Sequence, residues 1–398
     1  MSTSSKTASV RRADARCAQM QCVLVLQGGG ALGAYQAGVY QVLASVHRDP
    51  DWVAGVSIGA INAALIAGNP PERRLQRLRA FWEQVSSPMP AGLDAVLSGH
   101  LRGTANGVSA LRGVLFGVPG FFMPRVPGAA WHRRGTPGAI SHYDTEPLAR
   151  TLERLVDFDR INDGPMRLSV GAVNLRTGNF EYFDSTKRRI DARHVMASGA
   201  LPPGFPPVEI DGEWYWDGGL VSNTPLQYVL DHPVAQRRVV FQVDLFSALG
   251  DVPATLDDVA AREKDIRFSS RTRLNTDRAV ELQRLAASAR RVLDKLPPQL
   301  RDDPDVRALR AGLEHRAGAM DIVHLIYRSK HYETQSKDYE FSRRSMLEHW
   351  GAGVADMTRT LADPRWTQRE PDVEGVRVFD IPAADSGAGG AAPLASAP

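Results

Sequence analysis

Cysteine is scarce in this sequence, whose 398 residues contain only Cys17 and Cys22. A chain of this length buries roughly three quarters of its unfolded surface, so its core needs no disulfide staples. The two thiols therefore indicate a reduced compartment, in which both are chemically inert. Long apolar runs are missing too. Because no stretch reaches the length of about 18 apolar residues that crosses a bilayer, we expect no membrane-spanning helix.

The first 20 residues lack the apolar segment and cleavage site of a secretory signal. We expect a cytoplasmic protein whose contact with a membrane, if any, is peripheral. A large excess of charge is also absent, since the net charge is +3. Residues 1–20 carry all of it, and we expect them to form a disordered tail. The rest of the chain is neutral, which excludes the basic face of a nucleic-acid-binding domain.

Short apolar runs and helical patterns alternate along the N-terminal part of the chain. Residues 22–26 and 52–56 are compact apolar runs, typical of strands buried on both faces of a parallel sheet. Residues 34–46, 58–67 and 71–85 have helical patterns, the last with apolar residues at helical spacing behind a proline. This alternation predicts an α/β fold with helices on both faces of the sheet.

Residues 86–141 have a different composition, rich in glycine and proline with scattered large apolar side chains such as Phe121 and Phe122. An irregular stretch of this length is uncommon inside a compact domain unless it is a lid or a binding loop. We predict a lid or a lipid-contact surface here. An ordinary insertion with short helices is the alternative.

The remaining chain supplies further elements. Residues 255–316 and 342–361 have helical patterns. Residues 383–398 consist of Ala, Gly, Pro and Ser with few other side chains, and predict a second disordered tail. Additional strands are expected at 168–173, 179–183, 239–245, 322–327 and 376–381.

Three glycine-containing motifs carry the chemistry: Gly28–Gly33, Gly55–Gly59 and Asp217–Gly219. The second has the form G-x-S-x-G between a predicted strand and a predicted helix. It places Ser57 on a sharp turn, where Gly55 and Gly59 permit a strained backbone and close neighbouring chains. This arrangement predicts that Ser57 is a nucleophile.

A nucleophilic serine needs two partners. The first is a set of fixed N–H groups that receive the charge developing on a carbonyl oxygen, and the glycine loop can supply them. We assign Gly28, Gly29 and Gly30 to this oxyanion hole and Gly33 to the support of the loop. The second partner is a base. Asp217 is the candidate, and the following pair Gly218–Gly219 lets the chain turn toward a site.

Two alternatives use the same residues differently. The glycine loop also satisfies G-x-G-x-x-G, a dinucleotide-binding pattern. That pattern requires an acid at the carboxyl end of the second strand, whereas Asp49 and Asp51 precede the strand. A Ser–Asp–His triad is the other alternative, with His232 or His324 as its third member. No H-E-x-x-H motif or Cys/His cluster indicates a metal.

The three motifs, in this order, resemble the patatin-like phospholipase family. Residues 197–207 (ASGALPPGFPP) strengthen the resemblance, since they look like the segment that leads into the family's catalytic aspartate. The resemblance covers residues 21–245. Residues 265–375 resemble an uncharacterised bacterial extension of such proteins. We accordingly divide the chain into a patatin-like domain at 21–245 and a mainly helical extension at 246–382.

The resemblance implies a three-layer α/β/α core and a Ser57–Asp217 dyad that works without histidine. It also implies an acyl-enzyme, lipid ester substrates and no metal or organic cofactor. Gln27 and Leu32 depart from the family, which often has Asp and a basic residue at these places. A short-chain esterase or thioesterase, and an inactive lipid-binding regulatory protein, are the remaining alternatives. The sequence predicts no oligomeric state.

Overall fold

The structure is a computed structural model of the 398-residue chain. Residues 1–19 of the first predicted tail, including Cys17, and the second predicted tail lie outside the described residues, whereas Met20 already belongs to the first strand. The structure describes residues 20–87, 101–232, 236–269, 272–314, 319–330, 332–333, 335–370 and 375–381.

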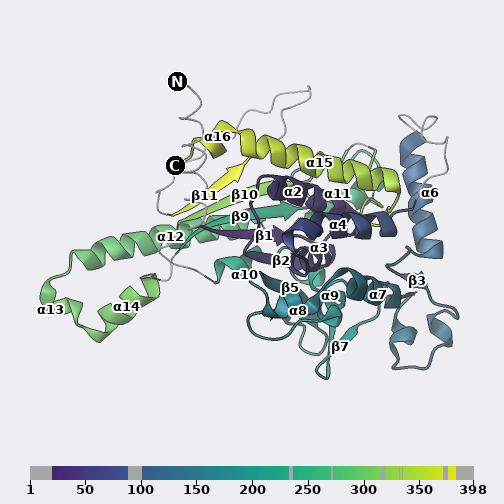
Figure 1. Cartoon of the computed structure of the whole chain (residues 1–398), viewed down its shortest axis with the longest axis horizontal. Helices are drawn as coiled ribbons and strands as arrows, with labels where there is room; N and C mark the ends of the chain where they lie inside the picture. The colour runs from purple at the N-terminus through teal and green to yellow at the C-terminus, as the bar shows by residue number, and fades with distance from the viewer. Residues whose placement is uncertain are drawn as a thin grey trace.

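A nine-stranded sheet forms the centre of the described molecule, in the order β11-β10-β9-β1-β2-β5-β8-β7, with β6 also paired to β5 (Figure 1). The six strands from β11 to β5 are mutually parallel, whereas β6, β8 and β7 run antiparallel to their neighbours. The strands are β1 (Met20–Leu26), β2 (Trp52–Val56), β5 (Arg167–Asn174), β6 (Phe180–Asp184), β7 (Val208–Ile210), β8 (Glu213–Asp217), β9 (Arg237–Asp244), β10 (Met320–Ile326) and β11 (Val376–Asp380).

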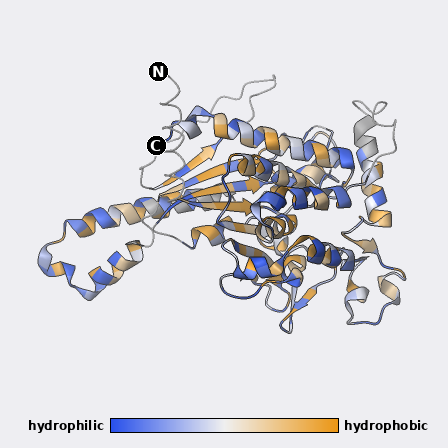
Figure 2. Cartoon of the chain, in the orientation of Figure 1, coloured by the Kyte–Doolittle hydropathy of each residue, from blue (hydrophilic) through white to orange (hydrophobic). Residues whose placement is uncertain are grey.

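Side chains of the central strands are buried on both faces of the sheet, as the apolar runs predict. In β1, Leu24 and Leu26 belong to the larger core, whereas Val23 and Val25 belong to a separate core cluster on the opposite face. Successive side chains of a strand point to opposite faces, which explains this division. Figure 2 shows the resulting hydrophobic colour of these strands.

Helices cover the two faces unequally. The larger core is closed by α2 (Ala34–Ser45), α3 (Ile58–Ala67), α4 (Pro71–Val85) and α15 (Arg343–Ala362). The smaller core is closed by α10 (Leu226–Leu230). The predicted α/β fold with helices on both faces of the sheet is therefore confirmed.

The segment after residue 245 completes the sheet of the preceding segment. Strand β10 pairs with β9 and β11 pairs with β10, both in parallel. Helix α15 packs so closely on α2 that a side chain at Gly38 would meet the carbonyl oxygen of Trp350 at 2.0 Å. Figure 1 shows three further helices of the segment projecting from one end of the sheet, namely α12 (Thr272–Asp294), α13 (Pro298–Arg301) and α14 (Pro304–Glu314). The segment also contains α11 (Leu256–Phe268) and α16 (Pro364–Thr367), which lie in the body of the molecule.

The prediction of an irregular 86–141 segment is wrong in part. Residues 88–100 lie outside the described residues, and a long helix, α6 (Leu101–Phe116), follows them. The glycines that suggested a loop are tolerated within this helix. Strand β3 (Met123–Pro124) then pairs with β4 (Tyr143–Asp144). Three further helices are α7 (Glu146–Leu155), α8 (Phe158–Asp163) and α9 (Ala192–Ser198); α9 lies beside β5 and β8, whereas α7 and α8 contact α3.

None of the helices in the described ranges has the length and apolar character that crossing a bilayer requires.

Candidate active site

Ser57 occupies a strained turn between β2 and α3. Its backbone has φ 55° and ψ −125°, which non-glycine residues rarely adopt and which is typical of a functional site. Side chains at the flanking glycines have no room. A Cβ at Gly55 would lie 2.3 Å from the carbonyl oxygen of Gly59, and one at Gly59 would lie 2.3 Å from that of Leu26. The G-x-S-x-G motif therefore packs as the sequence indicates.

Asp217 ends β8, and the antiparallel pairing of β8 with β5 sets Asp217 opposite Ala172. This brings its side chain to Ser57, 160 residues earlier in the chain. The Ser57 hydroxyl donates a hydrogen bond to Oδ2 of Asp217 at 2.7 Å. The other carboxylate oxygen, Oδ1, accepts the backbone N–H of Gly219 at 2.7 Å. The structure thus joins the two residues that the sequence selected as nucleophile and base.

Asp217 is buried, with 2% of its surface exposed to solvent. No Lys or Arg among the described residues pairs with its carboxyl group. Burial disfavours the charged form and raises the pKa of Asp217 to about 7, although the hydrogen bonds from Ser57 and Gly219 act in the opposite direction. A carboxyl group with a pKa near neutrality is an effective proton acceptor and donor at physiological pH.

The glycine loop follows β1 and begins the short 3₁₀ helix η1 (Gly30–Gly33). The N–H of Gly28 donates to the carbonyl oxygen of Asn223 at 3.1 Å. The N–H groups of Gly29 and Gly30 have no acceptor among the described residues. Of the three residues assigned to the oxyanion hole, Gly29 and Gly30 therefore keep free donors, and Gly28 supports the loop.

Glycine is required at the turn of this loop. Gly30 has φ +54°, and a side chain there would meet the carbonyl oxygen of Asp338 at 2.0 Å. The same carbonyl accepts the N–H of Ala31 at 2.7 Å. Gly33 lies on the next turn, where a side chain would meet Ile58 at 2.6 Å. The loop thus packs against both α3 and the C-terminal segment.

Two buried polar residues that the sequence analysis did not select hold the site together. Ser198 accepts the N–H of Ser57 at 2.9 Å and donates to the carbonyl oxygen of Gly171 at 2.6 Å. Asn223 donates through Nδ2 to the carbonyl oxygen of Gly28 at 2.9 Å. Ser198 belongs to the 197–207 segment that carried the family resemblance, which was a usable signal. Asn223 has only its position downstream of Asp217 to indicate a role.

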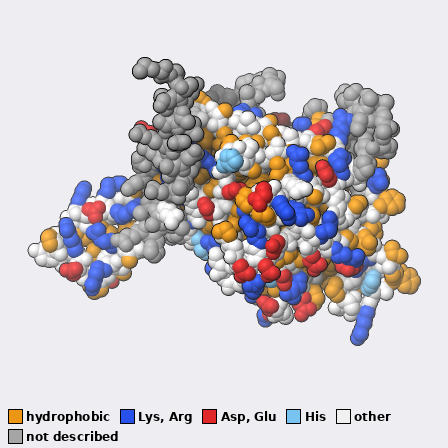
Figure 3. All heavy atoms as spheres, viewed as in Figure 1, with side chains coloured by type: hydrophobic (Ala, Val, Ile, Leu, Met, Phe, Trp, Pro, Cys, Tyr) orange, Lys and Arg blue, Asp and Glu red, His pale blue; other side chains and the backbone are white. Residues whose placement is uncertain are grey.

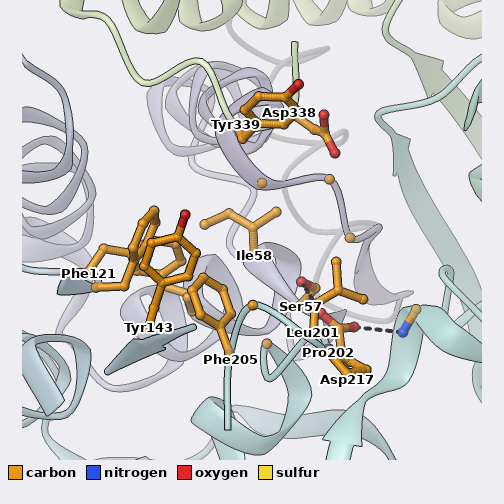
Figure 4. Close-up of a pocket in the computed structure, with 18 of the residues that line it drawn as sticks. Ser57, Ile58, Phe121, Tyr143, Leu201, Pro202, Phe205, Asp217, Asp338 and Tyr339 are labelled. Atoms are coloured by element: carbon orange, nitrogen blue, oxygen red, sulfur yellow. Dashed lines mark hydrogen bonds between the residues drawn. The ribbon is translucent and has the colours of Figure 1, made fainter. Parts of the chain in front are cut away.

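Ser57 and Asp217 lie at the edge of a pocket of about 370 Å³ (Figure 4). Figure 4 shows Phe121, Tyr143 and Phe205 gathered on the side of the pocket away from the serine and the aspartate. The lining is mainly apolar, which suits a hydrocarbon chain. Its large apolar side chains are Ile58, Ile61, Val114, Phe121, Phe122, Tyr143, Leu201, Phe205, Phe246, Phe268, Tyr339 and Phe341.

Phe121 and Phe122 belong to the wall of this pocket. They are 8% and 9% exposed, and the two rings contact each other at a centroid distance of 5.6 Å. Phe121 also packs on Phe205 and Phe341. Both rings are buried among other aromatic side chains, so this pair does not itself form an exposed lipid-contact surface. That residues 86–141 act as a lid or a lipid-contact surface stays a prediction.

The C-terminal segment supplies part of the pocket and secures Gln27, one of the two departures from the family pattern. Gln27 donates through Nε2 to Thr224 and to the carbonyl oxygen of Phe268, at 2.9 and 3.1 Å. Its Oε1 accepts the N–H groups of Leu245 and Phe246. An aspartate could not donate these bonds. The other departure, Leu32, is buried in the core and contributes no charge.

The residues of the two alternative sites lie elsewhere. The carboxylate of Asp51 accepts the N–H of Cys22, and that of Asp49 pairs with Arg74, both near the beginning of the strands and away from Ser57. Among the described residues that line the pocket, none is a histidine. The ring of His232 contacts the Tyr228 carbonyl oxygen at the end of α10. No three His, Cys, Asp or Glu residues in the described ranges gather as metal ligands.

Comparison with known proteins shows the family to which this sequence belongs. Residues 24–230 match the family described as patatin-like phospholipase, which is more than half of the chain. The chain belongs to the patatin-like phospholipase family. Residues 266–373 match a second family, described as patatin phospholipase, and these residues include strand β10 and helix α15.

A curated relative supports the same assignment. The chain is 27% identical over 218 residues to a cGAMP-activated phospholipase of Pseudomonas aeruginosa. The aligned stretch covers 51% of this chain and 54% of that protein. This patatin-like chain thus matches only about half of the relative's length.

Two solved structures are similar at a coarse level. VipD from Legionella pneumophila has a TM-score of 0.33 and 14% identity, with 86% of this chain and 66% of that chain covered. Human GIVD cytosolic phospholipase A2 has a TM-score of 0.36 and 11% identity, with 85% and 59% covered. At these TM-scores the likeness carries no argument about function.

Proposed function

We propose that this patatin-like protein is a serine acyl hydrolase that cleaves ester bonds of phospholipids or other lipids. The observation that carries the proposal is the 2.7 Å hydrogen bond from Ser57 to the buried carboxyl group of Asp217, at the edge of an apolar pocket. A serine hydroxyl is a weak nucleophile until a neighbouring group accepts its proton, and Asp217 is the group in contact with it.

In the first half of the reaction, the Ser57 oxygen attacks the ester carbonyl carbon while its proton passes to Asp217. The negative charge that develops on the carbonyl oxygen is received by the free N–H groups of Gly29 and Gly30. The tetrahedral intermediate then collapses, and the alcohol leaves with the proton held by Asp217. The acyl group remains esterified to Ser57.

In the second half, a water molecule attacks the acyl-enzyme and gives its proton to Asp217. The fatty acid leaves, and the Ser57 oxygen takes the proton back. Because one carboxyl group both accepts and donates in each half, a pKa of about 7 suits both tasks. The reaction requires no histidine.

The lining of the pocket supports a lipid substrate. Aromatic and aliphatic side chains form most of the lining, and Asp217 and Asp338 are the two acidic residues among the described residues that line the pocket. The name of the Pseudomonas relative, a phospholipase, is consistent with this substrate class. We infer that the acyl chain occupies the aromatic side of the pocket and that the headgroup faces its mouth.

A fluorophosphonate probe tests the mechanism directly, because it labels only an activated serine. We expect labelling of the wild-type protein and none of Ser57→Ala or Asp217→Asn. Since residues of a catalytic unit act together, each variant should lose nearly all turnover. Labelling of Asp217→Asn at the wild-type rate would contradict the dyad and direct attention to another base.

An ester panel then tests the substrate class. We expect phospholipids with long acyl chains to be cleaved with a higher kcat/KM than acetate or butyrate esters and thioesters. The opposite order would identify a short-chain esterase or thioesterase. A folded wild-type protein that neither labels nor turns over any ester, in the presence or absence of vesicles, would leave the inactive lipid-binding alternative.

A further inference from the structure

One end of the molecule exposes an unusual number of large apolar side chains. They lie on α6 and on the loop that follows β3. We define the α6 surface by six of them: Val108, Leu111, Leu115, Phe116, Val126 and Trp131. Phe116 is 75% and Trp131 is 83% exposed. Figure 3 shows hydrophobic side chains along the right-hand edge of the molecule, where Figure 1 shows α6 and β3.

The apolar side chains of α6 form a continuous outward face. Residues three and four apart share a face of an α-helix, so Val108, Leu111 and Leu115 form one stripe. Ala110 lies on the opposite side of the helix and is 2% exposed, which shows where α6 contacts the protein. The stripe therefore points away from the core, and packing among the described residues does not explain it.

The charge of this region has one sign. The sequence from residue 101 to residue 143 contains five arginines and neither aspartate nor glutamate. Arg112, on α6, and Arg133 and Arg134, next to Trp131, are exposed and have no carboxylate partner among the described residues. Since the chain as a whole has nearly balanced charge, this segment is a local concentration of positive charge around exposed apolar side chains.

The α6 surface adjoins the mouth of the pocket. Gly113 and Val114, on the inner side of α6, line the pocket itself. Tyr143, also in the lining, donates a hydrogen bond from Oη to the carbonyl oxygen of Val114 at 2.8 Å. A molecule that contacts the α6 surface therefore lies beside the opening through which a substrate enters.

We propose that the α6 surface docks this protein on a lipid bilayer that carries anionic headgroups. Large apolar side chains that insert at the headgroup boundary, surrounded by arginines, are the features of interfacial membrane binding. Exposed arginines attract an anionic leaflet, and the absence of acidic residues removes the repulsion that would oppose it. This docking surface would hold the enzyme on the membrane that contains its substrate, so the proposal rests on the proposed lipid hydrolysis. Binding to vesicles can nevertheless be measured without any turnover.

Cosedimentation with vesicles of dialkyl-ether phosphatidylcholine tests the proposal, because ether lipids contain no ester to cleave. The vesicles contain either no anionic lipid or 30% dialkyl-ether phosphatidylglycerol (about one anionic lipid in three). We expect binding to the anionic vesicles. The double variant Phe116→Ser/Trp131→Ser should weaken it at least ~10-fold, because two large aromatic groups no longer insert. The triple variant Arg112→Ser/Arg133→Ser/Arg134→Ser should weaken it ~100-fold at low salt.

Matched controls come from the projecting helices at the other end of the molecule. Leu285→Ser/Leu300→Ser removes two exposed apolar side chains, and Arg284→Ser/Arg307→Ser removes two exposed arginines. Both controls should bind vesicles like the wild type. None of the substituted residues lines the pocket, so all variants should retain circular dichroism spectra and cleave a soluble ester at the wild-type rate.

The outcomes separate the alternatives. Equal binding of the wild type and the aromatic variant, or equal loss in the controls, would overturn the proposal. A wild-type protein that is dimeric in analytical ultracentrifugation and becomes monomeric as Phe116→Ser/Trp131→Ser would also overturn it, since the surface would then join two copies of the chain. Vesicle binding without hydrolysis of any ester would refute the proposed function and leave the docking surface standing.

Discussion

The carbonyl oxygen of Asp338 accepts the backbone N–H of Ala31 at 2.7 Å, and it occupies the space where a side chain of Gly30 would lie. This contact joins the glycine loop to a segment more than 300 residues further along the chain. The side chain of Asp338 is itself fixed by Lys264, 2.7 Å away. The C-terminal segment therefore fixes the position of the free N–H groups beside Ser57.

Replacement of Gly30 by alanine tests this contact. We expect Gly30→Ala to lower kcat roughly 100-fold with little change in KM, because the loss of one oxyanion donor typically costs 10² to 10³ in rate. The control is Gly351→Ala in α15, where the added methyl group meets no atom within 4 Å. It should leave kcat unchanged and raise the free energy of unfolding by about 0.5 to 1 kcal/mol. Unchanged turnover in Gly30→Ala would contradict the assignment of the loop.

The pKa of Asp217 predicts the pH dependence of the reaction. Asp217 must be unprotonated to accept the Ser57 proton, and burial raises its pKa to about 7. We expect kcat/KM for a soluble ester to fall about tenfold per pH unit below this pKa and to level off above it. The ester should have no ionisable group between pH 5 and 9. A rate independent of pH across this range would exclude Asp217 as the base.

The same shift predicts how the stability of the protein changes with pH. Since the pKa of Asp217 is raised from an ordinary 3.8 to about 7, the folded state favours the protonated form. Its contribution to stability is fully present below about pH 4 and is lost as pH rises through 7. An uncharged asparagine can accept the Gly219 N–H through Oδ1 and donate from Nδ2 to the Ser57 hydroxyl oxygen, so the bond to Ser57 reverses its direction. We expect Asp217→Asn to be more stable than the wild type at pH 8, by up to about 4 kcal/mol, and equal to it at pH 4.

Urea denaturation at the two pH values measures this difference. Ser57→Ala provides a comparison, because it removes the hydroxyl but leaves the buried carboxyl group in place. A gap between wild type and Asp217→Asn that stays constant from pH 4 to pH 8 would show that Asp217 is not the titrating group. The expected trade-off is common at active sites, where function requires a group that the fold destabilises.

The sequence could indicate Ser57 and Asp217 because each stands in a local motif. The turn around Ser57 depends on its own glycines and on the flanking strand and helix, all within 20 residues. The approach of Asp217 to Ser57 depends on the pairing of β8 with β5, which no local pattern encodes. Only the order of the motifs in a known family connected the two before the structure did.

The supporting residues were harder to predict, because their roles depend on distant partners. Asn223 and Asp338 are single polar residues in loops, and their contacts with the glycine loop cross 195 and about 307 positions of sequence. Strands β10 and β11 were expected from their apolar runs, but their place beside β9 was not. For the stretch that contains Phe121 and Phe122, composition suggested a lid or a lipid-contact surface, and it could not show that aromatic partners from three other segments bury both rings.

Gln27, which stands where the family often has aspartate, can be tested by substitution. Its side chain is completely buried, donating to Thr224 and Phe268 and accepting from Leu245 and Phe246. Gln27→Glu keeps the shape but replaces the donor by a buried carboxylate facing two acceptors. We expect it to lower the free energy of unfolding by about 3 kcal/mol or more at pH 8.

The loss caused by Gln27→Glu should shrink below pH 5, where protonation of the glutamate restores a donor. Guanidinium denaturation at pH 8 and pH 5 measures it. Gln368→Glu, an exposed substitution of the same kind, is the control and should change stability by less than about 0.5 kcal/mol. An equal effect of the two substitutions would mean that the hydrogen bonds of Gln27 contribute little.

The aromatic wall of the pocket provides a last prediction, which separates substrate binding from membrane docking. Phe121 packs on Phe81, Phe205 and Phe341, so Phe121→Ala leaves a cavity and should destabilise the fold by about 3 to 5 kcal/mol. Phe121→Leu fills most of that volume and serves as the milder variant.

Because Phe121 lines the pocket and not the outer surface, Phe121→Leu should raise KM for soluble long-chain esters and for vesicle substrates by the same factor. Phe116→Ser/Trp131→Ser should impair vesicle substrates alone, since these side chains lie outside the pocket. Initial rates on a micelle-free soluble ester and on anionic vesicles of cleavable phospholipid measure both ratios. A Phe121→Leu variant impaired only on vesicles would place the ring in the membrane contact and not in the acyl-chain pocket.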